Sequence, residues 1–329
     1  MTTDLPPTEP THRGRADLPP QIRQRTVAKA RTLLEALPFM RDHHGKVIVV
    51  KYGGAAMDTS RSLGGSLGGL ASSFAEDIAL LQSAGITAVV VHGGGPQVTN
   101  LSERLGIETT FVDGLRVTDA ETLDVATMVL AGKLNTDVVA SLVTGGVRAV
   151  GLSGVDGGLL LARKQAGPDL GFVGEVVHVN ADVLRTLTEQ RFVPVVASIA
   201  VDETTGQAYN VNADVVASQL AIELGAEKLV FINDVPGVIG PTGDLLSELS
   251  ASQCLELLAQ PGVVAGGMIP KLESSAASLR AGVRRVHLVD GRVEHSLVLE
   301  LFTPEGVGTM VTPDAEPAGP AGPAGEAAP

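Results

Sequence analysis

Short apolar runs rich in β-branched residues, separated by longer helical stretches, constrain the fold of this chain most. Runs without polar residues, such as 47–50 and 88–91, are typical of strands buried on both faces of a parallel sheet. We expect strands at residues 47–50, 88–91, 147–152, 193–197, 229–232 and 286–289. We expect helices near residues 74–84, 96–105, 119–131, 134–143, 181–190, 212–224, 247–259 and 271–281. This alternation predicts an α/β fold, an open and mainly parallel sheet sandwiched between helices.

The composition excludes several classes of protein. Of 329 residues, 44% are hydrophobic. No apolar run reaches the ~18–20 residues that cross a membrane, and residues 1–20 lack the apolar segment of a signal peptide. The single cysteine, Cys254, excludes an internal disulfide framework, and the net charge of −13 argues against nucleic-acid binding. We predict a cytoplasmic protein with neither membrane nor nucleic acid as partner.

The two chain ends differ from the main body. Residues 1–20 and 313–329 are rich in proline or small residues, and we predict that both are disordered. Residues 21–38, between the N-terminal end and the first strand, are predicted to form an amphipathic helix extension, and we expect Pro38 to end this helix. Its apolar stripe is interpreted as docking on the main body or on another subunit, although a basic helix of this kind can also bind a membrane surface.

Two strands lead directly into glycine clusters. Lys51-Tyr52-Gly53-Gly54 follows the first strand, and His92-Gly93-Gly94-Gly95-Pro96 follows the second. Glycine at the carboxyl end of a parallel strand lets backbone N–H groups approach a ligand closely. The two clusters therefore predict one anion-binding crevice. Lys51 is either a cation in that crevice or a strand-end lysine that reaches solvent, and its own position leaves both open.

The standard motifs of several enzyme classes are absent from the sequence. It contains neither G-x-x-x-x-G-K-[ST] nor G-x-G-x-x-G, which disfavours a P-loop NTPase and a conventional dinucleotide enzyme. No HExxH spacing and no second cysteine support a zinc site, and no G-x-S-x-G elbow supports a serine hydrolase. No metal-ligating residue is predicted.

Further polar residues stand at predicted helix starts. Pro270 fits a helix N1 position, so Lys271 would lie in the first turn, where a lysine points to a shared anion. Asn212 and Asp214 open another helix, and capping alone would explain both. Arg116 suits a bidentate grip on a carboxylate, with a plain surface arginine as the alternative.

Six motifs, in this order, resemble the amino acid kinase family, and within it the acetylglutamate kinases. They are Val50-Lys51-Tyr52-Gly53-Gly54, Val91-His92-Gly93-Gly94-Gly95-Pro96, Gly114-Leu115-Arg116-Val117-Thr118, Asn210-Val211-Asn212-Ala213-Asp214, Asp234-Val235-Pro236-Gly237-Val238 and Gly267-Met268-Ile269-Pro270-Lys271. The first two occur in several members of the family. The third and fourth together are much more specific to the acetylglutamate enzymes.

The resemblance implies transfer of the γ-phosphoryl group of ATP to the side-chain carboxylate of N-acetyl-L-glutamate, in arginine biosynthesis. It implies that Lys51 and Lys271 neutralise the phosphoryl group in flight and that Asp214 holds both lysines. Substrate binding would fall to Gly94, Gly95, Arg116 and Asn210, with the backbone of Gly53 and Gly54 at the phosphates. The nucleotide would be lined by Asp234, Val235, Pro236, Gly237, Val238, Ile239, Val263, Val264 and Ala265. Mg²⁺ would be held mainly by phosphates and water. Residues 46–200 would be the N-acetylglutamate-binding lobe and 201–312 the nucleotide-binding lobe.

The same resemblance implies regulation. Arginine-inhibited members have an N-terminal helix that joins dimers into a hexamer, and a C-terminal stretch like residues 300–309 of this chain. That stretch and the helix would form an arginine site, with Glu300, Gly306 and Gly308 as candidates. Some members bind a PII-type regulator, and no motif of this chain bears on that partner.

The sequence departs from the family pattern at two places. Ala55 replaces an asparagine that is common in the family, and the Gly-Ser stretch at 61–70 is long, which puts closure of this loop over the substrate in question.

Two alternative functions are another carboxylate or carbamate kinase of this fold, and a catalytically idle arginine-sensing assembly protein. Arg116 and Asn210 argue against the first. Retention of Lys51, Lys271 and Asp214 argues against the second.

Overall fold

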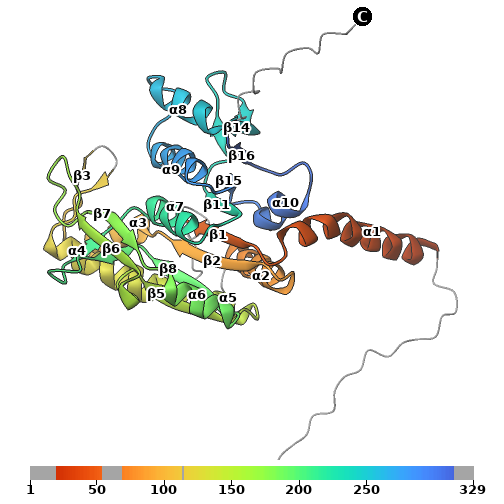
Figure 1. The fold of residues 1–329 in the computed structure, drawn as a ribbon, viewed down its shortest axis with the longest axis horizontal. Coiled ribbons are helices and arrows are strands. Elements are labelled where there is room, and N and C mark those ends of the chain that lie inside the picture. Colours follow the sequence, from red (N-terminus) through yellow and green to blue (C-terminus); the bar gives the residue numbers. More distant parts are fainter. Residues whose placement is uncertain (1–19, 54–68, 113–114, 315–329) are drawn as a thin grey trace, which may run out of the picture.

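The central feature of the fold is a sheet of eight strands covered by helices on both faces (Figure 1). The computed structural model describes residues 20–53, 69–112 and 115–314. The strand order is β14-β16-β15-β11-β1-β2-β8-β5, and all neighbours are parallel except β15 and β16. The strands are β1 (Val47–Tyr52), β2 (Thr87–His92), β5 (Ala149–Ser153), β8 (Val193–Ala197), β11 (Lys228–Asn233), β14 (Glu248–Ser250), β15 (Arg285–Asp290) and β16 (Thr309–Thr312). The predicted fold class and all six predicted strands are confirmed.

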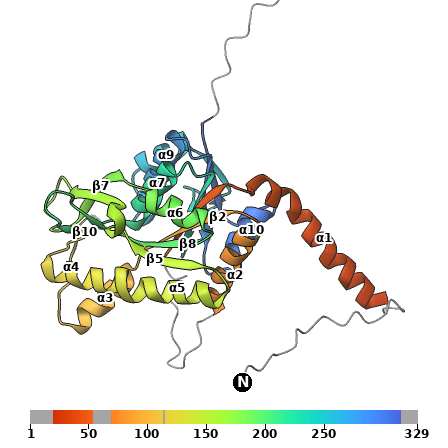
Figure 2. The same cartoon turned by 60° about the horizontal axis from the view of Figure 1, so that its bottom comes forward.

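Alternation along the strands divides the apolar core into two layers. In β1, Val49 faces one layer, whereas Ile48 and Val50 face the other. The first layer is covered by α6 (Asp182–Glu189), α7 (Ala213–Glu223), α8 (Ala251–Ala259) and α9 (Met268–Arg280). The second is covered by α2 (Gly69–Ser83), α3 (Gly95–Arg104), α4 (Ala120–Thr127), the π-helix η2 (Met128–Leu134), α5 (Asn135–Thr144) and α10 (Ser296–Phe302) (Figure 2).

A second, four-stranded sheet was not predicted. Its order is β10-β9-β6-β7, from β10 (Ala208–Asn210), β9 (Ile199–Val201), β6 (Leu160–Lys164) and β7 (Gly174–Val179). Two short ribbons pair β3 (Phe111–Val112) with β4 (Leu115–Arg116), and β12 (Val238–Ile239) with β13 (Leu245–Leu246). The predicted lobe boundary at 200/201 falls within β9, and the small sheet continues to Asn210.

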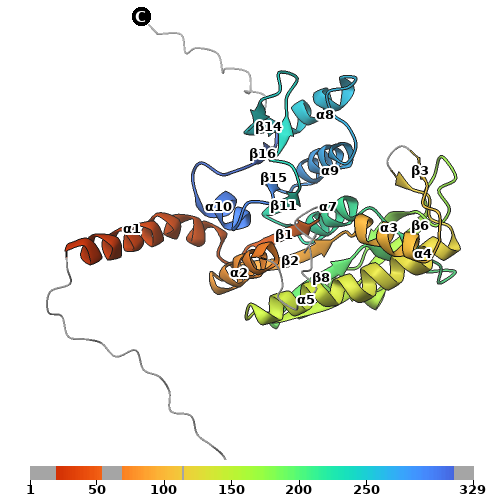
Figure 3. The same cartoon turned by 180° about the vertical axis from the view of Figure 1, so that it is seen from behind.

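The N-terminal helix is longer than predicted. α1 runs over Pro20–His43 and continues through Pro38, so the prediction that Pro38 ends it is wrong. A proline removes one helical hydrogen bond. Here Phe39 and Met40 pack against the core beyond the proline, and this packing holds the last turn in helical conformation. The rest of α1 projects from the body in all three views (Figure 3). The predictions for the extreme chain ends, for Ala55 and for nearly all of the 61–70 stretch lie outside the described residues.

The continuous helical segment Ala120–Thr144 is the one described helix whose length and mean hydropathy of 1.2 would suffice to cross a membrane. Half of its apolar window is buried inside the structure. Leu123, Val125 and Leu142 are among its buried side chains, and they belong to the second core layer or lie beside it. The segment therefore has the packing of a core helix.

Candidate active site

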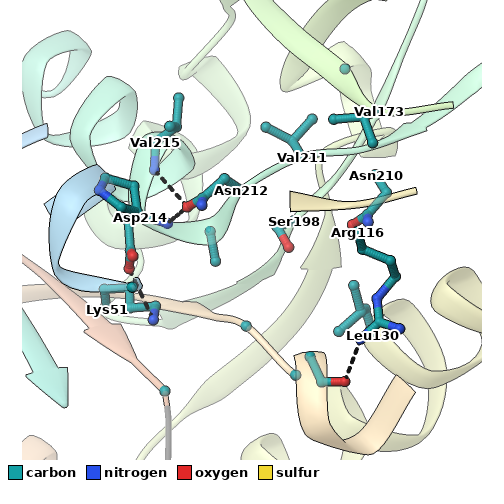
Figure 4. Close-up of a pocket in the computed structure, with 18 of the residues that line it drawn as sticks. Lys51, Arg116, Leu130, Val173, Ser198, Asn210, Val211, Asn212, Asp214 and Val215 are labelled. Carbon is teal, nitrogen blue, oxygen red and sulfur yellow. Dashed lines mark hydrogen bonds and ion pairs between the residues drawn. The ribbon is translucent and has the colours of Figure 1, made fainter. Parts of the chain in front are cut away.

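A cavity of about 930 Å³ opens at the carboxyl ends of β1 and β2 (Figure 4). The described residues that the sequence assigns to catalysis, substrate binding and phosphate binding line it together with Asn212, although they come from six different elements or turns. These residues are Lys51, Gly53, Gly94, Gly95, Arg116, Asn210, Asn212, Asp214 and Lys271. The cavity lies at the edge where ligands of open α/β sheets bind, and residues of both glycine clusters line it.

Two lysines share one buried carboxylate in the cavity. Lys51 Nζ lies 2.9 Å from Asp214 Oδ1, and Lys271 Nζ lies 3.0 Å from Asp214 Oδ2. The three side chains are 10%, 15% and 6% exposed for Lys51, Lys271 and Asp214 respectively. Lys271 also donates to the carbonyl of Gly267 at 3.0 Å. The predicted contact of Asp214 with both lysines is present in the structure.

The charge balance of this cluster favours an anionic ligand. Burial alone would raise the pKa of Asp214, but the charges of Lys51 and Lys271 outweigh it and hold the pKa below its usual value. Asp214 is therefore ionised, and the cluster carries one net positive charge. A partly desolvated positive charge attracts an anion more strongly than the same charge in water.

Helix starts place Asp214 and Lys271, whereas Lys51 lies near the end of strand β1. Asn212 is the N-cap of α7, and its Oδ1 accepts from the N–H of Asp214 at 2.7 Å, so Asp214 lies in the first turn as predicted. α9 begins at Met268, which makes Pro270 its third residue, so the prediction of Pro270 at N1 is wrong. Gly267 is the N-cap, so the helix begins two residues earlier than predicted. Lys271 still lies within the first turn and a half.

The glycines leave room for neighbouring side chains. A Cβ on Gly53 would lie 2.4 Å from Lys51 Nζ, so the lysine occupies the space that a side chain would take. At Gly94 a Cβ would lie 2.5 Å from Leu134 Cδ2 and 2.6 Å from Leu130 Cδ2. Gly94 caps α3, whose first N–H groups have no partner within the helix and are available to an anion. Gly54, the other predicted phosphate-binding glycine, lies outside the described residues.

Arg116 reaches the cavity from the β3–β4 ribbon, across from the lysines (Figure 4). Its Nη2 donates to Gly95 O at 2.9 Å and to Thr99 Oγ1 at 2.7 Å. Its guanidinium carbon lies 4.8 Å from the centre of the Phe111 ring. Burial lowers the pKa of Arg116, which nevertheless stays charged. Nη1 is buried without a hydrogen-bond partner among the described residues, which fits a carboxylate ligand.

Asn210 lies beside Arg116 at the end of β10. Its Nδ2 donates to Thr118 Oγ1 at 3.3 Å. Sequence reasoning missed Thr99, Thr118 and Phe111, which orient Arg116 and Asn210. Thr118 belongs to the motif Gly114-Leu115-Arg116-Val117-Thr118, but its partner Asn210 is 92 residues away in the sequence, so no local pattern indicates the contact.

The predicted nucleotide residues do not line this cavity. The turn 234–239 follows β11, which pairs with β1, so the turn leaves the sheet beside Lys51. Residues 263–265 precede α9, which carries Lys271. Both segments are therefore close in the fold to the two lysines, outside the cavity itself.

Glu300, Gly306 and Gly308 line a second cavity of about 1170 Å³ at the base of α1. Glu300 Oε1 lies 2.6 Å from His287 Nδ1, and its Oε2 accepts from the N–H groups of Val307 and Gly308 at 2.7 and 3.1 Å. Phe39 and His43 of α1 line the same cavity. The helix and the C-terminal stretch thus meet at one site.

Among the described residues, no three His, Cys, Asp or Glu side chains are gathered as a metal site. The carboxylate of Asp214 is taken by the lysines. These residues do not form a set of protein ligands that would enclose a divalent ion. They fit an ion that is bound chiefly by the nucleotide phosphates.

The fold and this cluster define the class of protein. The profile of the Amino acid kinase family matches residues 46–290, and the chain belongs to this family. Curated relatives in which nearly half of the aligned residues are identical to those of this chain are acetylglutamate kinases. Those of Hydrogenobaculum sp. (strain Y04AAS1) and Symbiobacterium thermophilum are 46% and 49% identical, each over 88% of this chain and 99% of their own length. Within the family the chain belongs with the acetylglutamate kinases.

Solved structures agree on the fold. N-acetylglutamate synthase from Neisseria gonorrhoeae, complexed with coenzyme A and N-acetyl-glutamate, has a TM-score of 0.76 at 28% identity, over 87% of this chain and 64% of that chain. The same synthase was also solved with coenzyme A and L-arginine. Carbamate kinase from Giardia lamblia bound to AMP-PNP shares the fold at 17% identity, with a TM-score of 0.60 over 82% of this chain and 99% of its own.

Proposed function

We propose that this chain transfers the γ-phosphoryl group of ATP to the side-chain carboxylate of N-acetyl-L-glutamate, giving N-acetylglutamyl 5-phosphate in arginine biosynthesis. The observation that carries the proposal is one cavity with a buried lysine pair on one side and an unsatisfied Arg116 on the other. The relatives named acetylglutamate kinase supply the substrate.

The transfer needs positioning and charge stabilisation more than proton transfer. A carboxylate oxygen is already nucleophilic, so it attacks the γ-phosphorus while the bond to the β–γ bridging oxygen breaks and ADP leaves. Lys51 and Lys271 stabilise the charge on the phosphoryl oxygens, and Asp214 fixes their ammonium groups. Backbone N–H groups at Gly94 and Gly95 bind oxygens of the phosphoryl group or the substrate.

Arg116 and Asn210 select the substrate. The free Nη1 of Arg116 binds the α-carboxylate, while Nη2 stays anchored on Gly95 and Thr99. Asn210 contacts the acetylated amine. A lobe from residue 46 to Asn210 therefore binds acetylglutamate, and the remainder of the body to residue 312 binds the nucleotide.

The nucleotide lies over the turn 234–239 and residues 263–265. In support, Asn233 precedes this turn, is 2% exposed, and has no hydrogen-bond partner for either side-chain amide atom among the described residues. A buried polar group left unpaired indicates a missing partner. Mg²⁺, bound by the phosphates and water, supplies further neutralisation of charge on the nucleotide.

We further propose feedback inhibition by arginine and assembly into a hexamer in the cytoplasm. The second cavity offers the Glu300 carboxylate, and α1 exposes apolar residues that a second copy of the chain would cover. Leu33 and Leu34 of α1 are 69% and 65% exposed.

An ADP-release assay with Mg-ATP tests the proposal against its alternatives. The acceptors are N-acetylglutamate, glutamate, aspartate and carbamate at equal concentration. We expect turnover with N-acetylglutamate far above the other three. Preference for an unacetylated acceptor would indicate another kinase of this fold, and turnover with none would indicate an arginine-sensing assembly protein.

A further inference from the structure

A buried polar pair lies behind the glycine turn and has no part in the transfer described above. It consists of His92, the last residue of β2, and Asn135, the first residue of α5. His92 is 0% and Asn135 5% exposed, and neither is among the described residues that line the cavity. Polar groups buried this deeply destabilise a fold unless they are paired, so their partners show what they hold in place.

The hydrogen bonds determine which histidine nitrogen carries the proton. Asn135 Nδ2 lies 2.9 Å from the carbonyl oxygen of Val195 and 3.4 Å from that of Leu152. Carbonyl oxygens only accept, so the amide nitrogen must face them. The same nitrogen lies 3.0 Å from His92 Nε2, which therefore accepts. The two amide hydrogens thus point to Val195 O and His92 Nε2, the two nearer acceptors, and the contact with Leu152 O is the weaker one. The proton is then on Nδ1, which donates to Gly93 O at 2.9 Å.

The surroundings keep this ring neutral. Burial lowers the pKa of His92 to about 4, and the charge of Lys51 acts in the same direction. A neutral ring with one donor and one acceptor can link Asn135 to Gly93, whereas a charged ring would present two donors. The chain of contacts therefore runs from β5 and β8 through Asn135 and His92 to the Gly93 carbonyl.

The π-helix completes this support. Asn135 follows η2 directly, and Leu130 and Leu134 of η2 pack so closely against Gly94 that a Cβ there would require both side chains to move. One helical segment thus contacts both Gly94 and, through His92, Gly93. π-helical segments inserted within α-helices are frequent at functional sites.

We propose that His92 and Asn135 are positioning residues, which fix the Gly93 carbonyl so that the turn Gly93–Gly95 keeps the shape that receives the phosphoryl group. The inference rests on the proposed function, because the shape of this turn affects turnover only if a phosphoryl group passes beside it. A displacement of about 1 Å in such a group can lower a rate on the order of 10²-fold.

Two substitutions of His92 separate this role from general packing. In His92→Asn the amide nitrogen stands near the position of Nδ1 and retains a donor toward Gly93. In His92→Gln the amide nitrogen stands near the position of Nε2, and the donor toward the Gly93 carbonyl is lost. We expect His92→Gln to lower kcat on the order of 10²-fold at nearly unchanged KM, with His92→Asn recovering most of that loss. His178→Gln, on the exposed part of β7, is the matched control.

Thermal unfolding of each variant establishes that it is folded. Equal kcat values for folded His92→Asn and His92→Gln would overturn the proposal. Wild-type protein that forms no product from N-acetylglutamate would instead refute the proposed function.

A measurement without substrate covers the case in which the variants fail to fold. In wild-type protein with ¹⁵N-labelled histidine and isotope-labelled glycine, NMR should show the His92 ring, assigned by its coupling to Gly93, as the neutral Nδ1–H tautomer at pH 6. The assignment separates it from His43 and His287, which are also buried with Nδ1 beside an oxygen. A His92 ring protonated on Nε2, or charged at pH 6, would overturn the proposal whatever the activity.

Discussion

Lys51 and Lys271 share one buried carboxylate, so the cavity keeps one positive charge for its ligand. Removing either lysine leaves a neutral cluster that no longer stabilises charge in the transition state. We expect Lys51→Ala and Lys271→Ala each to lower kcat by about 10²–10³-fold, with a smaller effect on folding. Steady-state kinetics and thermal unfolding measure the two effects.

Lys133→Ala is the control for this pair, since Lys133 is 62% exposed and, within the part of the chain that the structure describes, its ion pair is with Asp137 one turn further along the helical segment. It should keep wild-type kinetics. If Lys51→Ala retained more than about a tenth of the wild-type kcat, electrostatic stabilisation by the cluster would not be the main contribution.

Arg116 is expected to act on binding more than on the chemical step. Its planar fork spans Gly95 O, Thr99 Oγ1 and a free Nη1, which a single ammonium cannot reproduce. Arg116→Lys should raise KM for N-acetylglutamate about tenfold to a hundredfold while kcat falls less. A loss confined to kcat, with KM unchanged, would contradict the assignment of Arg116 to the α-carboxylate.

The charged residues of the site could be singled out because each stands beside a local signal in the chain. Lys51 precedes glycines at a strand end, and Asp214 follows an N-cap asparagine, but only the family resemblance gave the two residues their roles. Thr99 and Phe111 could not be predicted, since their contacts with Arg116 join different elements. Which histidine nitrogen carries a proton at His92 likewise depends on a residue 43 positions away.

Among the elements, α2 and α10 are joined by an ion pair. His295 Nδ1 lies 2.7 Å from Asp77 Oδ1, and the hydrogen bond to Asp77 raises the pKa of His295 above its usual 6.5. A pKa that is higher in the folded state gives stability that is complete below about pH 6.5 and lost as the pH rises through the raised value. The pair should therefore stabilise the fold more at pH 6 than at pH 9.

His295→Asn tests this pair, because asparagine tolerates the left-handed backbone of that position (φ 57°). Half of the His295 side chain is exposed to solvent, so the effect is small. We expect Tm to fall by about 1–3 °C at pH 6 and by less at pH 9. A Tm difference that is the same at both pH values would show that the charged pair contributes nothing.

Strand length decided which elements the sequence could predict. β1, β2 and β11 have six residues each, and the apolar run in each was long enough to predict a buried strand from the sequence. β9 and β10 have three residues each and depend on pairing, β10 with β9 and β9 also with β6. Pro38 was misread for a related reason, since the packing of Phe39 and Met40 outweighs the hydrogen bond that the proline removes.

For the whole molecule, the projecting part of α1 has few contacts of its own to hold it in place. We expect deletion of residues 1–38 to leave an active but smaller oligomer with weakened arginine inhibition, because Phe39 and Met40 still cover the core. Light scattering gives the mass, and activity at increasing arginine concentration gives the inhibition.

The double variant Leu33→Glu/Leu34→Glu in the full chain is the companion test, since both side chains are exposed in the described structure and their loss cannot open the core. It should reproduce the smaller oligomer. A hexamer with wild-type inhibition after the deletion would show that α1 serves neither assembly nor regulation.

The central claim is that a phosphoryl group passes to the side-chain carboxylate beside the glycine turn, and trapping the product tests it most directly. An acyl phosphate reacts with hydroxylamine to form a hydroxamate. With Mg-ATP and N-acetylglutamate, we predict one hydroxamate for each ADP released, and none with N-acetylglutamine, in which an amide replaces that carboxylate. ADP release without hydroxamate, or equal product from N-acetylglutamine, would contradict the account.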